Sequence, residues 1–147
     1  MLARTDDLDA NGLSAQEALV CTMVLVAATG GGISDQEIGV MAGIVQTLPV
    51  FADFSSVQLD AATEAAVRLL REDNGLKHAA RLIRDALEPR LRETAYALAC
   101  DVVAADGFVA QDSLQLLDFV KTELRIESLA AAAIERGARA RHQRVVA

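Results

Sequence analysis

The sequence is poor in the residues that cross-link a chain, interrupt helices or favour sheets. It contains no tryptophan, two prolines and two cysteines in 147 residues, and aromatic residues make up 3% of it. Much of its apolar content is alanine and leucine, which favour helices over sheets. We therefore expect an all-α fold. We also expect Cys21 and Cys100 to be buried, reduced thiols of a cytoplasmic protein, with a disulfide between them as the open alternative.

Long apolar runs and a basic surplus are also absent. The longest uncharged stretch, residues 18–34, contains Gly30-Gly31-Gly32 and is too short to span a bilayer. The first eleven residues carry three aspartates and one arginine, unlike the basic start of a secretory signal. The formal net charge of -7 argues against a general nucleic-acid-binding protein, so we expect no nucleic-acid partner.

What the chain does contain is a series of helix signals. Ser14 with Glu17, and Ser34 with Glu37, form two capping boxes, each followed by an apolar pattern of helical spacing. Ser56 is expected to cap a third helix, and Phe51 and Phe54 in the segment before it are expected to fill the core. Together with the turn residues Asn74-Gly75, Glu88-Pro89 and Asp106-Gly107, the pattern predicts about seven helices. Their expected extents are about 14–29, 34–48, 56–74, 76–87, 89–105, 114–124 and from 127 onward.

No linker or low-complexity segment divides the chain. We expect a flexible acidic leader at residues 1–12, a single helical domain at residues 13–140 and a basic tail at residues 141–147.

Two segments of the chain align without a gap when it is shifted by 76 residues. The shift places Gly31 on Gly107 and Ile38 on Leu114, and each copy is a helix, a glycine turn and a helix. This predicts two helical hairpins related by a pseudo-twofold axis, although chance similarity of helical hairpins is the alternative. Both hairpins are acidic, because residues 1–64 carry a net charge of -8 and residues 93–135 carry -6. Residues 65–92 carry +3 and the last twelve residues +4.

The two hairpin turns resemble the signature of the TerB-like (tellurite-resistance protein B) family. The second copy reads AADGFVA at residues 104–110, and the first reads AATGGGISDQE at residues 27–37; the family pattern is Ala-Asp-Gly-x-Ile/Val-Ser-x-x-Glu. The resemblance implies an all-helical domain with two such hairpins. It also implies a role in tellurite resistance and chemical-stress response, divalent-metal binding, and work in complexes at the inner face of the membrane rather than as an enzyme.

Each copy keeps one half of the acidic pair in that pattern. The first copy has Gly30 at the aspartate position and keeps Glu37, whereas the second keeps Asp106 and has Ser113 at the glutamate position. If the two turns meet, their carboxylates could together bind a Ca²⁺ or Mg²⁺ ion, since both cations prefer oxygen ligands. The alternative is that these acids only cap helices and form turns. The predicted ligands are Asp35, Glu37, Asp101, Asp106 and Asp112.

A second cation hypothesis concerns the N-terminus. Residues 7–12 (DLDANG) match the first half of an EF-hand calcium loop, but the closing acid is replaced by Ala18 and no helix precedes the loop. A solvated acidic leader is the simpler interpretation.

The function alternatives differ in what the charged surfaces bind. The first is a non-enzymatic TerB-like module that holds a divalent cation and binds a partner protein. The second is a cation-independent scaffold, in which the acidic hairpins and the basic residues Lys77, Arg81 and Arg84 make protein contacts, including contacts between copies of the chain. Catalytic motifs are lacking, because no nucleophile elbow, phosphate-binding glycine loop or zinc-ligand spacing is found.

Overall fold

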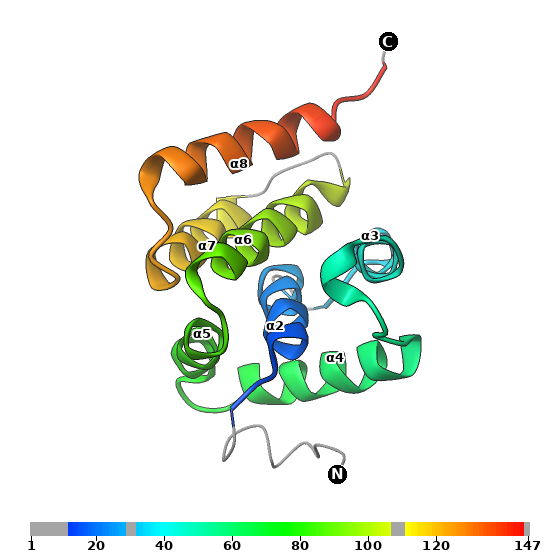
Figure 1. Ribbon diagram of the computed structural model, residues 1–147, viewed down its shortest axis with the longest axis vertical. Helices are drawn as coiled ribbons and strands as arrows, with labels where there is room; N and C mark the ends of the chain where they lie inside the picture. Colours follow the sequence, from blue (N-terminus) through cyan, green and yellow to red (C-terminus); the bar gives the residue numbers. More distant parts are fainter. Residues whose placement is uncertain (1–11, 29–31, 107–110, 146–147) are drawn as a thin grey trace.

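In the computed structural model, which describes residues 12–28, 32–106 and 111–145, the chain is all-helical (Figure 1). The described part contains seven α-helices, two short 3₁₀-helices and no strand, which confirms the predicted fold class. In chain order the elements are α2 (Ala15–Ala27), α3 (Asp35–Thr47), η1 (Pro49–Phe51), α4 (Ser56–Leu70), α5 (Gly75–Ala86), α6 (Pro89–Val103), η2 (Ala104–Asp106), α7 (Gln111–Glu123) and α8 (Ser128–Arg141).

Helix α2 forms the centre of the molecule. All ten residues from 18 to 27 are buried, and the helix packs against α4, α5, α6 and α7 (Figure 1). A helix that is apolar on every side is stable in water only when other elements enclose it. Its one buried polar side chain, Thr22, donates to the carbonyl of Ala18 at 2.8 Å, so no polar group is left unsatisfied there.

Three serines fix the starts of α2, α3 and α4. In each case the serine Oγ accepts from the backbone N–H three residues later at 3.1 Å, and the side chain of that residue accepts from the serine N–H. The prediction for the third helix was wrong by one residue. Ser55 is the cap, because Gln58 three residues on closes the box, and Ser56 is the first helical residue.

The predicted break at Asn74-Gly75 is confirmed. Asn74 adopts a left-handed conformation with φ of 58°. A Cβ on Gly75 would lie 2.5 Å from the carbonyl oxygen of Leu69, so only glycine fits where α5 passes so close to the end of α4. Pro89 begins α6, as expected for a residue with a fixed φ and no N–H.

The connection between α3 and α4 closes one end of the core. Phe51 is buried, and its ring centroid lies 5.4 Å from that of Phe54, as predicted for two core-filling aromatics. The side chain of Gln16 in α2 donates to the carbonyls of Val50 and Ala52, which holds this connection against the central helix.

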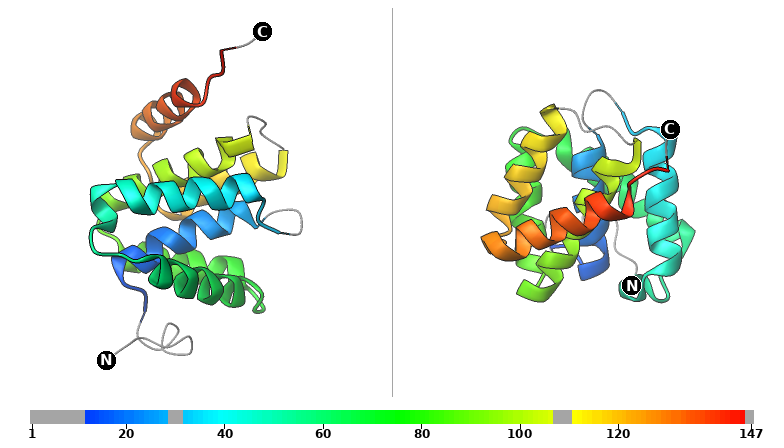
Figure 2. Two further views of the ribbon diagram at one scale, coloured as in Figure 1. Left: turned by 90° about the vertical axis from the view of Figure 1, so that its right-hand side faces the viewer. Right: turned by 90° about the horizontal axis from the view of Figure 1, so that it is seen from above.

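The two hairpins agree with the repeat in their helix bounds. The shift of 76 residues places the ends of α3 on the ends of α7, and α2 packs along α6. The C-terminal ends of α2 and α6 and the N-terminal ends of α3 and α7 lie at one end of the molecule (Figure 2). We call these helix ends, together with η2, the hairpin end. A duplication as the origin of this arrangement stays a prediction.

Helix α8 lies across α6 as an outer layer (Figure 1). It buries Ala131 and Ala138 there, which lets the two backbones approach closely. Across the described residues, no helix is long and apolar enough to cross a membrane.

Candidate functional site

The predicted metal ligands all lie at the hairpin end. Asp35 and Glu37 are in the first turn of α3 and Asp112 is in that of α7. Asp106 ends η2, and Asp101 is in the last turn of α6. Helix α3 packs against η2, the short turn of helix that ends at Asp106. The fold therefore brings the first hairpin next to the second, as the hypothesis of a shared site requires. The contacts of each carboxylate show how far the geometry supports that hypothesis.

Glu37 is used as a helix cap. Its Oε1 accepts from the N–H of Ser34 at 2.8 Å, and the side chain is half-buried. Asp35 in the same helical turn is exposed. Both acids lie where the N-terminal partial charge of α3 favours a carboxylate, whether or not a cation binds.

The second hairpin contributes Asp106 and Asp112. Asp112 is exposed in the first turn of α7, in the same kind of position as Asp35. Asp106 is the last residue of η2, and its side chain lies outside the described part of the chain. The glycine positions of the family pattern, Gly31 and Gly107, and the EF-hand-like segment up to residue 11 also lie outside it.

Asp101 has protein partners instead of an open coordination position. Its Oδ1 accepts from Nη2 of Arg141 at 2.7 Å and lies 3.3 Å from Nε2 of His142. Only 18% of the Asp101 side chain is exposed. The carboxylate therefore ties the end of α8 to α6, a role that sequence reasoning missed because the partners lie 40 and 41 residues away.

Among the residues whose side chains the structure describes, no three His, Cys, Asp or Glu groups gather as a metal site. Of the five predicted ligands, one caps a helix, one is ion-paired, two are exposed and one is not described. The shared cation site thus stays a prediction.

Two apolar side chains at the hairpin end are exposed. Ile38 in α3 is 52% exposed and Leu114 in α7 is 48% exposed. Both residues belong to the apolar spacing of their helices, but in these first turns no other described element buries them. They are equivalent under the repeat, so the two hairpins present matching apolar side chains, each near an exposed aspartate.

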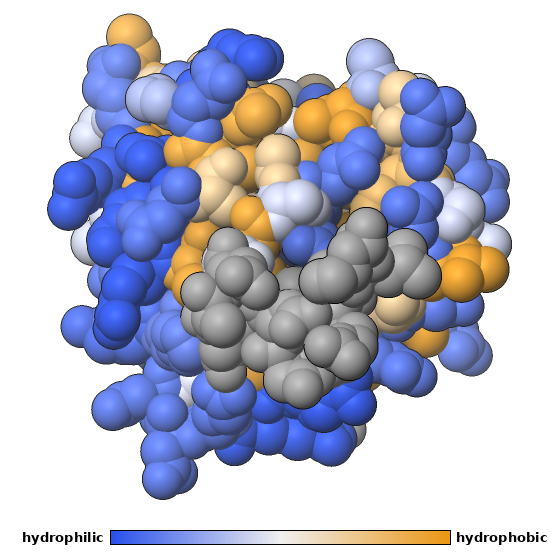
Figure 3. Space-filling model, turned by 60° about the horizontal axis from the view of Figure 1, so that its bottom comes forward, coloured by the Kyte–Doolittle hydropathy of each residue, from blue (hydrophilic) through white to orange (hydrophobic). Residues whose placement is uncertain are grey.

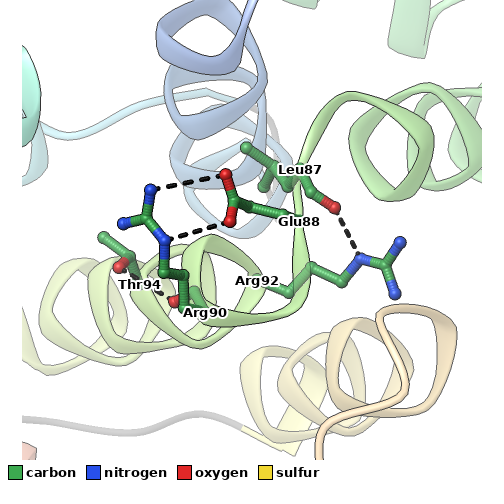
Figure 4. Close-up of polar contacts among 5 residues, drawn as sticks. All are labelled: Leu87, Glu88, Arg90, Arg92 and Thr94. Carbon is green, nitrogen blue, oxygen red and sulfur yellow. Dashed lines mark hydrogen bonds and ion pairs between the residues drawn. The ribbon is translucent and has the colours of Figure 1, made fainter.

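Only part of the predicted basic stripe on α5 is an open surface; its other cations contact protein groups. Lys77 and Arg81 are exposed, and polar side chains gather over α5 on the left of Figure 3. Arg84, which is half-buried, lies 3.8 Å from Asp85. The nearby Arg92 has backbone partners instead. Its guanidinium donates to the carbonyl of Leu87 at 2.8 Å (Figure 4) and to that of Arg84 at 3.0 Å.

The cysteines are buried and unpaired. Cys21 and Cys100 are both free in the structure. Burial raises the pKa of each thiol to about 12, so neither is a thiolate nucleophile near neutral pH.

Comparison with known proteins places the helical part of the chain in one family. No curated protein and no solved structure gave a match to the chain. Residues 16–136 match the family described as tellurite resistance protein TerB, and this stretch runs from the first turn of α2 into α8. The chain therefore belongs to the TerB family.

Proposed function

We propose that this TerB domain is a non-enzymatic module of a tellurite-resistance-type system, and that it acts by binding a protein partner through its hairpin end. The observation that carries this proposal is the pair Ile38 and Leu114, each about half exposed at equivalent positions of α3 and α7. Apolar side chains that sit inside a polar rim are typical of a protein contact surface.

The charge around this pair indicates the kind of partner. Asp35 and Asp112 are exposed close to Ile38 and Leu114 in their helices, and Glu37 lies in the same turn as Asp35. A partner surface with an apolar centre and basic residues at its rim would complement this face. The basic surface of α5 offers such complementarity within a second copy of the chain, so self-association is one form of the proposal.

The test uses substitutions on the hairpin end and one elsewhere. The purified Ile38→Glu/Leu114→Glu variant and the Val57→Glu variant are compared with wild type in affinity capture and in sedimentation velocity at low and high salt. Val57 is a good control because it is an even more exposed apolar residue, at 75%, and lies in the first turn of α4. We expect the same partner, or the same self-association, with wild type and Val57→Glu, and its loss with the double variant. Equal retention by all three proteins would overturn the proposal.

A second candidate function is divalent-cation binding at the same end. It is supported by the packing of α3 against η2, which brings the acidic first turn of α3 and the turn that ends at Asp106 to one end of the molecule. A bound Ca²⁺ or Mg²⁺ would relieve the repulsion between carboxylates and hold the two hairpins together. Asp35, Glu37, Asp106 and Asp112 would bind it directly, and Asp101 would require release from Arg141.

The cation test must separate ligation from capping. Gln fills the same capping position after Ser55 in this chain, so Glu37→Gln should keep the cap and remove only the charge. We expect metal-stripped wild type to melt at a higher temperature with millimolar Ca²⁺ or Mg²⁺, and Glu37→Gln/Asp106→Asn to show no such increase. A cation effect that persists in this variant would contradict the site, as would amide shifts confined to residues 7–17.

A further inference from the structure

A cavity of about 350 Å³ opens between α7 and α8 above α6. Its volume lies at the small end of the range for ligand-binding pockets, which is about 300–1,000 Å³. The floor is formed by buried residues of α6, and the walls come from the facing sides of α7 and α8. The apolar part of the lining includes Val103, Leu114, Leu117 and Ala138.

The cavity exists because α8 has short side chains on its inner face. Ala131 and Ala138 are its buried residues, and α8 packs mainly on α6. Ala138 lines the cavity opposite the α7 residues Leu117 and Lys121 with only a methyl group. A longer apolar residue at position 138 would fill the cavity.

The polar groups that line the cavity differ in whether they already have a hydrogen-bonding partner. Tyr96, at the floor, donates its hydroxyl to Oε2 of Glu135 at 2.5 Å, so that carboxylate oxygen already has a hydrogen-bonding partner. The ammonium of Lys121 lies 3.8 Å from the same oxygen and 3.7 Å from Oδ1 of Asp118. Both distances exceed hydrogen-bond length, so each is only a loose ion pair.

The cations therefore offer donors that the described protein groups do not take up. Lys121 is 34% exposed and carries three N–H donors, while Arg139 is exposed at the rim. The carboxylate of Asp118 is 74% exposed, largely in contact with solvent. A ligand anion would gain hydrogen bonds here, whereas a ligand cation would meet one carboxylate already bonded and one facing water.

We propose that this cavity binds a small amphiphilic carboxylate, such as a medium-chain fatty acid. Its apolar chain lies between Leu117 and Ala138, and its carboxylate is bound by Lys121, with Arg139 at the rim. The cavity shares Leu114 with the partner surface proposed above, but Lys121, Ala138 and Arg139 lie outside that surface, so this site does not depend on that function.

The first experiment compares three probes of the same chain length that differ in head group: octanoate, octanol and octylamine. Each is titrated into the isotopically labelled full-length protein, and binding is followed by backbone amide NMR. We expect saturable shifts around residues 117–121 and 135–139 with octanoate, and at least tenfold weaker binding of the other two probes. Octylamine or octanol binding as tightly as octanoate would overturn the proposed anionic anchor.

Three variants test the site itself. Lys121→Met should weaken octanoate binding at least tenfold, and Ala138→Leu should abolish it by filling the cavity. Arg136→Met is the matched control, because it removes an exposed cation of α8 that does not line the cavity, and it should leave the affinity unchanged. Thermal melts verify that each variant is folded. Unchanged octanoate binding by Lys121→Met, or absence of saturable octanoate shifts in wild type, would contradict the proposal.

Discussion

At the scale of single residues, two arginines in the first turn of α6 contrast an exposed ion pair with hydrogen bonds to backbone carbonyls (Figure 4). Arg90 makes an exposed pair with Glu88 at 3.0 Å, whereas the half-buried Arg92 donates to two carbonyls at the C-terminal end of α5. Exposed pairs contribute little to stability, whereas hydrogen bonds from a charged donor to helix-end carbonyls contribute more.

We therefore expect Arg92→Met to lower the free energy of unfolding by about 1–2 kcal/mol. Arg90→Met should lower it by less than about 0.5 kcal/mol. Urea denaturation of the two variants beside wild type measures the difference. Equal losses would show that the carbonyls of Arg84 and Leu87 do not depend on Arg92.

The predicted ligand Asp101 shows why single residues were the hardest to assign from the sequence. Its position near a family motif predicts a metal ligand, but its partners in the structure are Arg141 and His142, near the C-terminal end of the chain. Spacing along one helix carries no information about a helix 40 residues away. The basic tail could be recognised in the sequence, but the sequence does not identify the acidic residue that the tail contacts.

At the scale of whole elements, α3 contains two glycines that the fold does not require. Cβ atoms built on Gly39 and Gly43 would meet nothing within 4 Å, and both residues lie inside the helix. Glycine in a helix interior costs up to about 1 kcal/mol relative to alanine. Gly75 is the opposite case, because a Cβ there would collide with backbone carbonyls.

We expect Gly39→Ala and Gly43→Ala each to raise the free energy of unfolding by about 0.5–1 kcal/mol. Gly75→Ala should lower it, because its Cβ has no room. Thermal melting of the three variants tests this ordering. If the alanines in α3 stabilise the fold but also weaken partner capture, the open face of α3 belongs to the contact surface.

The extents of the helices were predictable from local chemistry, whereas their exposed faces were not. Serine caps, Asn74-Gly75 and Pro89 mark helix ends because each acts on its own backbone. The choice between Ser55 and Ser56 was wrong, and α4 ends at Leu70, before the expected stop at Asn74. Ile38 and Leu114 followed an apolar spacing that says which face of a helix is apolar. That spacing does not say how far along the helix another element covers that face.

At the scale of the whole molecule, the other helices pack around α2 and enclose it. The central helix has no polar face, so its environment depends on the packing of α4, α5, α6 and α7 together. Composition predicted an all-α fold, whereas the position of α2 at its centre follows from the assembled structure. The same enclosure controls the acid–base behaviour of Cys21, whose thiol is buried inside it.

That enclosure predicts a loss of stability at alkaline pH. Burial raises the pKa of Cys21 from 9.0 to about 12, so between these values the unfolded chain releases a proton that the folded chain retains. The stabilisation is complete below pH 9 and is lost as the pH rises toward 12, at about 1.4 kcal/mol per pH unit. Cys100 and Tyr96, whose pKa values burial also raises, add to the same decline.

Urea denaturation at several pH values from 7 to 11 should show the free energy of unfolding falling above pH 9. In Cys21→Ala, which is less stable at neutral pH because of the cavity it leaves, that decline should be shallower by the contribution of one thiol. An identical slope in both proteins would mean that Cys21 titrates normally, and hence that the centre of the helical bundle is open to water.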